Sequence, residues 1–152
     1  MAIGLASAIA LLMIAATVLL HYELLRGTSL LIPRLAIPAR TRIIVVIGGA
    51  FVAHVLEIGL YAVTFWAMQD HLGLGTLAGR LEGTALDFFY FSTANFTTLG
   101  VGDLYARGPM RIVASIQSLN GLVLIGWSAS FTYLAMEQFW ELHRRRPANE
   151  ER

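Results

Sequence analysis

Three long apolar stretches, separated by more polar segments, run along the chain. They cover residues 2–25, 43–68 and 110–140. At a rise of about 1.5 Å per residue, each is long enough to cross the hydrocarbon core of a bilayer. The pattern therefore predicts three membrane-spanning helices, and the third is long enough to require tilt or an extension beyond the membrane.

The first apolar stretch has two interpretations, a retained helix and a cleaved signal peptide. A signal peptide has a basic segment ahead of a shorter apolar core and a small-residue cleavage site after it. Residues 2–25 contain no lysine or arginine, and the first basic residue is Arg26. We therefore favour a retained transmembrane helix.

Basic residues predict the orientation of the helices. Residues 26–42 contain no acidic residue but four arginines, which are Arg26, Arg34, Arg40 and Arg42. Gly27, Pro33 and Pro38 predict that no long helix continues through this segment, which is either a short interfacial element or an irregular loop. A second basic group, residues 143–146, follows the third stretch. Because basic loops remain in the cytoplasm, both groups are expected there, with the N-terminus outside.

The segment between the second and third stretches predicts a shorter helix. Residues 69–83 are polar and glycine-rich, which is typical of an outer loop. Thr84 and Asp87 have the spacing of a capping box, so we expect a helix from Ala85 to Thr97. Such a helix is too short to cross a membrane. It must enter and stop, which is tolerated only where protein or a water-filled cavity surrounds it.

Two glycines alternate with branched residues directly after this helix, in the sequence Thr97-Thr98-Leu99-Gly100-Val101-Gly102-Asp103. Glycine adopts positive φ readily, so successive carbonyl groups of such a strand can point to one side. Several copies around an axis would form rings of oxygen that replace the hydration shell of a cation. One loop cannot enclose a pore, and cyclic symmetry is the usual way to supply the copies.

Composition narrows the function classes. The chain is 57% hydrophobic and 14% charged, unlike a soluble domain. It has no cysteine, so disulfides, thiol catalysis and cysteine metal sites are excluded. We find no basic pattern that would bind nucleic acid. We do not expect an enzyme, and we expect no cofactor other than permeant potassium or sodium ions.

His54 and Glu57 lie within the second stretch and share one helix face with Tyr61. Ionisable groups at this depth require a partner. A metal site and a proton relay are alternatives, but two ligands make a weak site, so we favour a hydrogen-bonded structural pair. By depth along the helices, Asn120 and Gln117 are the expected partners of Glu57.

The order of outer helix, short helix, glycine strand and inner helix resembles the pore module of the potassium-channel superfamily. The resemblance covers residues 43–140, and the usual strand there is Thr-Val-Gly-Tyr-Gly-Asp. It implies an all-α membrane protein with three transmembrane helices plus a re-entrant pore helix and filter loop. Residues 1–25 would be an additional N-terminal helix, 26–42 a basic loop and 141–152 a short cytoplasmic tail, as in some small bacterial channels. The family implies a homotetramer in the lipid of the cell membrane.

The resemblance also implies roles for individual residues. Carbonyl groups of Thr98, Leu99, Gly100 and Val101, with the Thr98 hydroxyl, would coordinate the ion. Gly102 would let the strand turn outward, and Asp103 would lie behind the outer mouth. On the inner helix, the hinge and the cavity wall would be formed by Gly121, Leu122, Ile125, Ala129 and Tyr133.

Three positions depart from the family pattern. Leu99 replaces the usual valine, and Val101 replaces the usual tyrosine and cannot make its bracing hydrogen bond. Ala94 stands where some members have a glutamate behind the filter. A potassium-conducting channel is the favoured function. A non-selective or sodium-permeable channel of the same fold and a non-conducting accessory subunit are the alternatives.

Overall fold

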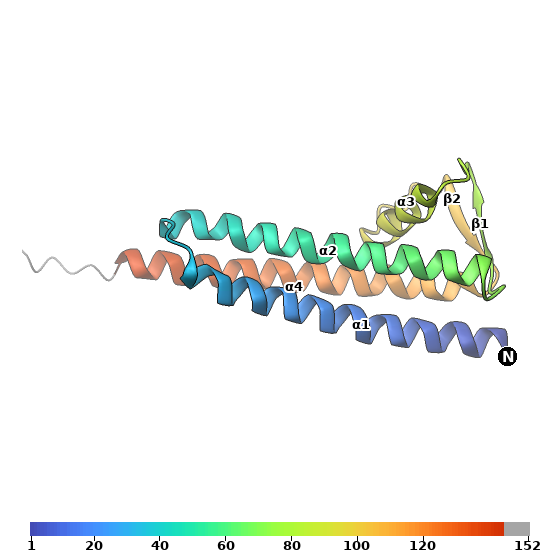
Figure 1. Ribbon diagram of the computed structural model, residues 1–152, viewed down its shortest axis with the longest axis horizontal. Helices are drawn as coiled ribbons and strands as arrows, with labels where there is room; N and C mark the ends of the chain where they lie inside the picture. The colour runs from blue at the N-terminus through green and yellow to red at the C-terminus, as the bar shows by residue number, and fades with distance from the viewer. Residues whose placement is uncertain (145–152) are drawn as a thin grey trace, which may run out of the picture.

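The computed structural model describes residues 1–144, and its frame is a bundle of three long helices. Helices α1 (Ala2–Leu31), α2 (Ala39–Asp70) and α4 (Met110–Arg144) run side by side, and the short α3 (Ala85–Phe96) lies inclined against one end (Figure 1). All three long helices are apolar and long enough to span a membrane. The three predicted spans are therefore confirmed.

Helix α1 is longer than its apolar pattern suggests. It continues through Gly27 to Leu31, so the expected break at Gly27 is wrong. A glycine inside a helix costs only about 1 kcal/mol, which packing easily outweighs. The helix ends where the 3-10 turn η1 (Ile32–Arg34) begins, with Pro33 in its first turn. Residues 35–38 form no helix or strand, and α2 begins after Pro38.

A two-stranded antiparallel sheet, which the sequence did not predict, covers the α3 end of the bundle. Strand β1 (Thr76–Gly79) pairs with β2 (Leu104–Arg107), with Thr76 opposite Arg107. The strands flank α3 and the glycine strand in the sequence, so their pairing closes this region into one loop. The N-terminus lies at the same end of the molecule (Figure 1).

The main hydrophobic core lies at this same end. Aromatic residues Tyr61 and Phe65 of α2 pack with Phe91 of α3. Helix α1 contributes the small residues Ala6 and Ala10, which allow close approach between helices. The core thus joins α3 and α1 to the remaining helices. The predicted tail, residues 141–152, lies outside the described residues from position 145 onward.

Candidate functional site

The N-terminus of α3 is fixed by Asp87. Its carboxylate accepts hydrogen bonds from the backbone N–H groups of Glu82, Gly83 and Thr84, at distances between 2.8 and 3.2 Å. The capping box of Thr84 and Asp87 is present, which confirms this prediction. Asp87 is buried, and its negative charge also suits the positive end of the helix dipole.

The predicted glycine strand, residues 97–103, forms neither a helix nor a regular β-strand in the structure, although we keep the name for this segment. It is hydrogen-bonded to the C-terminal end of α3. The N–H of Thr98 donates to the carbonyl oxygen of Asn95 over 3.0 Å, and the N–H of Gly100 donates to that of Ala94 over 3.3 Å. The strand therefore begins as a tight continuation of the helix, which limits its freedom.

Positive φ angles recur at every second residue of the strand. φ is +57° at Thr98, +59° at Gly100 and +83° at Gly102. The positive φ expected of the two glycines is confirmed. The positive φ of Thr98 could not be predicted from the spacing of the glycines, because β-branched residues rarely adopt this conformation. Its strain is of the kind that accumulates at functional sites.

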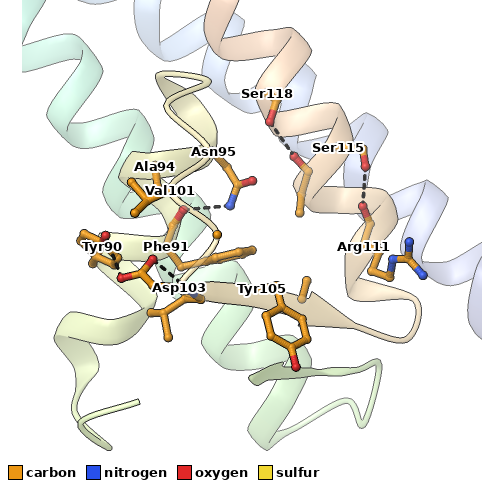
Figure 2. A pocket seen from close by; sticks show the side chains of 15 residues that line it. Tyr90, Phe91, Ala94, Asn95, Val101, Asp103, Tyr105, Arg111, Ser115 and Ser118 are labelled. Carbon is orange, nitrogen blue, oxygen red and sulfur yellow. Dashed lines mark hydrogen bonds between the residues drawn. The ribbon is translucent and has the colours of Figure 1, made fainter. Parts of the chain in front are cut away.

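Asp103 follows the strand and connects it to α3. The hydroxyl of Tyr90 donates to Oδ2 of Asp103 over 3.0 Å, and the N–H of Leu104 donates to Oδ1 over 2.9 Å (Figure 2). The carboxylate raises the pKa of Tyr90 above its ordinary value, because it accepts its hydrogen bond from the protonated phenol. Tyr90 thus takes the partner role for Asp103 that Ala94 cannot fill.

A cavity of about 300 Å³ lies behind the strand. Ala94 and Val101, two of the three positions that depart from the family pattern, both line it (Figure 2). The side chain of Val101 is 56% exposed, so nothing in the single chain packs fully against it. The described chain therefore leaves the strand less braced here than at Asp103.

Gly121 of α4 touches the end of α3. A β carbon at this position would collide with the carbonyl oxygen of Phe96. The structure thus gives Gly121 a packing role, and its predicted role as a hinge stays a prediction.

The residues predicted to face the pore are exposed on α4, and they are Leu122, Ile125, Ala129 and Tyr133. Ile125, Ala129 and Tyr133 line one apolar pocket of about 750 Å³, together with Phe96 and Thr97 at the end of α3. The structure therefore brings three of the four predicted cavity residues together at the start of the glycine strand.

The expected pairing of Glu57 with Asn120 or Gln117 is wrong. Gln117 is buried, and its Nε2 donates to Oγ of Ser92 over 2.7 Å. Asn120 is also buried, and its Nδ2 donates to Oγ1 of Thr17 over 2.7 Å and to the hydroxyl of Tyr61 over 3.1 Å. Both α4 amides are therefore engaged with other helices.

Glu57 is paired with two histidines. Its Oε2 lies 3.0 Å from Nδ1 of His54, which confirms the predicted hydrogen-bonded pair. Its Oε1 lies 2.8 Å from Nδ1 of His21, a partner that was not predicted. His21 comes from α1, and both it and Glu57 are completely buried. Depth along α2 and α4 could not predict the contact with His21, since this contact depends on where α1 packs. The only signal for His21 was an ionisable residue inside an apolar stretch.

Comparison with known proteins identifies the family of the chain. No curated protein and no solved structure gave a significant match to the chain. The profile of the Ion_trans_2 family, described as an ion channel, matches residues 43–138. The matched region includes most of α2, the β1–β2 sheet, α3, the glycine strand and most of α4, which is more than half of the chain. This is a pore module of the potassium-channel type, and the chain belongs to this ion channel family.

Proposed function

We propose that the protein is a homotetrameric, potassium-conducting channel with Thr98 to Gly102 as its selectivity filter. The observation that carries the proposal is the alternation of positive φ at Thr98, Gly100 and Gly102. This alternation turns successive carbonyl groups toward one side, which suits coordination of a dehydrated cation. The carbonyls of Thr98, Leu99, Gly100 and Val101 and the hydroxyl of Thr98 are the proposed ligands.

The position of α3 supports a cation path. Its C-terminal end, where helix carbonyls carry partial negative charge, lies beside the start of the strand. Four such ends around an axis favour a cation in the cavity below the filter. Several weak oxygen sites in series then let ions enter and leave.

The environment of the strand supports an assembly of several copies around an axis, as in the proposed tetramer. Residues 97–103 form neither helix nor strand, and irregular backbone facing lipid leaves polar groups without partners. In a cyclic assembly these residues face the axis and the other copies instead. The exposed side chains of Leu99 and Ile125 then lie at subunit interfaces or in the cavity.

The proposed orientation places the N-terminus outside and the C-terminus in the cytoplasm. The sheet and the N-terminus lie at one end of the bundle, and η1 with its arginine lies near the other (Figure 1). The positive-inside rule assigns the arginine-rich end to the cytoplasm. The filter then opens to the outside of the cell membrane.

A second function, a channel that does not discriminate potassium from sodium, is favoured by one observation. Val101 and Ala94 leave the cavity of about 300 Å³ behind the filter. A filter without packing at this point adjusts its width more easily, which weakens selection by the carbonyl ring.

Flux through liposomes containing the purified protein tests both functions. Potassium flux, with a bi-ionic reversal potential that favours potassium over sodium, supports the first, and equal permeability supports the second. Gly100→Ala is the matched inactive variant, since alanine is strained at φ +59°. Absence of flux for either cation, in protein shown to be folded, contradicts both. Cross-linking in the same liposomes tests the tetramer.

A further inference from the structure

Three helices meet at a buried cluster that lies outside the proposed filter. His21 of α1, His54 and Glu57 of α2, and Ser128 of α4 form a closed cycle of contacts. The potential ligand atoms of the two histidines and the carboxylate all lie within 4.8 Å of one another. Burying a carboxylate and two imidazoles at this depth is costly, so the cluster requires a compensating interaction.

The four contacts of the cluster need one hydrogen each. Each Nδ1 faces Glu57, and the Nε2 atoms of His21 and His54 lie 3.3 and 3.1 Å from Oγ of Ser128. Two neutral rings, an ionised carboxylate and the serine supply three hydrogens for these four contacts. One contact would then set two lone pairs against each other. One additional cation, a proton or a metal ion, removes this conflict.

We propose that His21, His54 and Glu57 bind one divalent transition-metal ion, with Zn²⁺ as the best match. Two imidazole nitrogens and one carboxylate oxygen form a ligand set that suits zinc and leaves a fourth position open. Ligands of tetrahedral zinc lie roughly 3.3 Å apart for bonds of about 2 Å. The two nitrogen-to-oxygen distances of 2.8 and 3.0 Å are close to this value, and no two ligand atoms of the set are more than 4.8 Å apart.

Ser128 fits the role of an outer partner in this site. With the metal on both Nδ1 atoms, both Nε2–H groups donate to the serine oxygen, which has two lone pairs. Metal-bound histidines usually donate their second ring N–H to such a partner, which fixes the tautomer and the ring orientation. One hydroxyl therefore satisfies both rings.

Aromatic rings surround the two histidines. The His21 and His54 rings are stacked, with centroids 5.3 Å apart and an angle of 29° between their planes. Trp127 lies 5.2 Å from the His21 ring and Phe96 lies 5.6 Å from the His54 ring. These aromatic rings shield the site and hold both ligands in place.

The metal has an access path and a structural consequence. His54 and Ser128 line the apolar pocket of about 750 Å³ beside α4, and the His54 side chain is 17% exposed. An ion in this pocket reaches the cluster without unfolding the bundle.

Because His21 lies outside the family-matched residues 43–138, a bound ion clamps the additional helix α1 onto the pore module.

Metal analysis of the full chain tests the proposal. The purified protein, stripped with a chelator and equilibrated with Zn²⁺, is expected to retain about one ion per chain, and Co²⁺ is expected to give the visible absorption of a four-coordinate site. Glu57→Gln and His21→Asn are expected to weaken binding at least about 100-fold, since a direct ligand contributes more than an outer partner. His71→Asn, which removes an exposed histidine, is the matched control and keeps the site.

Wild-type protein decides the proposal even if a variant fails to fold. Retention of one ion, lost in Glu57→Gln and kept in His71→Asn, supports it. If the wild-type chain binds no ion, or if His71→Asn loses it as well, the proposal is overturned. The extra positive charge in the cluster is then a proton.

Discussion

Gly121 of α4 lies directly against the carbonyl oxygen of Phe96, the last residue of α3. No side chain fits between the two helices at this point. The contact sets the position of the α3 C-terminus and therefore of the strand that follows it. A glycine at the family's hinge position thus has a packing reason that is independent of any bending.

Gly121→Ala is expected to destabilise the protein by about 1–3 kcal/mol, the usual cost of overpacking. The added methyl group would force α3 and α4 apart. Thermal unfolding in detergent measures the loss of stability, and liposome flux measures the effect on the proposed filter.

Gly126→Ala is the matched control for this substitution. It lies on the same helix, and a β carbon added there would meet nothing within 4 Å. Alanine is a better helix former, so stability is expected to stay equal or to rise by up to about 1 kcal/mol. Equal effects of both substitutions on stability would contradict the packing role of Gly121.

Asp87→Ala is expected to loosen the N-terminus of α3. The substitution removes the acceptor for three backbone N–H groups, at a cost of about 0.5–2 kcal/mol. Hydrogen exchange in the first turn of α3 is expected to accelerate. Glu82→Ala is the control, because it removes an exposed carboxylate but leaves the backbone N–H in place. Faster exchange in Glu82→Ala than in Asp87→Ala would contradict the assignment.

Local features of the fold could be predicted from the sequence. The three spans follow from runs of apolar residues, the start of α3 from Thr84 and Asp87, and positive φ from Gly100 and Gly102. Each depends on residues that are close in the chain. The positive φ of Thr98 could not be predicted in this way, because its strained conformation is imposed by its surroundings and opposes the preference of a β-branched residue.

Features that depend on distant residues could not be predicted. The β1–β2 pair joins segments separated by α3 and the glycine strand, and four-residue strands have too short a pattern to detect. Glu57 was assigned to the wrong helix because neither apolar runs nor depth reveal which face of α1 meets α2. The side-chain partners that join different helices could be identified only from the packed structure.

Thr17→Val is expected to weaken the docking of α1 on α4. Oγ1 of Thr17 is buried and accepts the hydrogen bond of Asn120, and valine keeps the shape but not the acceptor. Such bonds between membrane helices contribute about 0.6–1.5 kcal/mol. A double-mutant cycle with Asn120→Leu, followed by thermal unfolding, measures the coupling.

Thr28→Val is the control for the α1 contact. The hydroxyl of Thr28 donates to the carbonyl oxygen of Leu24 within α1 itself. Its removal is expected to show no coupling to Asn120→Leu. Additive effects of Thr17→Val and Asn120→Leu would show that this hydrogen bond does not stabilise the contact.

The hydrogen bond between Tyr90 and Asp103 predicts a shifted titration. The Asp103 carboxylate raises the pKa of Tyr90, so the phenolate absorbance that disappears in Tyr90→Phe is expected to develop above the ordinary tyrosine pKa of about 10. Asp103→Asn removes the charge and is expected to move this titration back toward the ordinary value. Because the folded pKa is raised, the contribution of this bond to stability is complete below the ordinary pKa and is lost as the pH rises through the folded value. Tyr105→Phe, another exposed tyrosine at this end of the molecule, is the control for the difference spectrum. A Tyr90 titration that Asp103→Asn leaves unchanged would show that this carboxylate does not hold the phenol and does not connect the end of the glycine strand to α3.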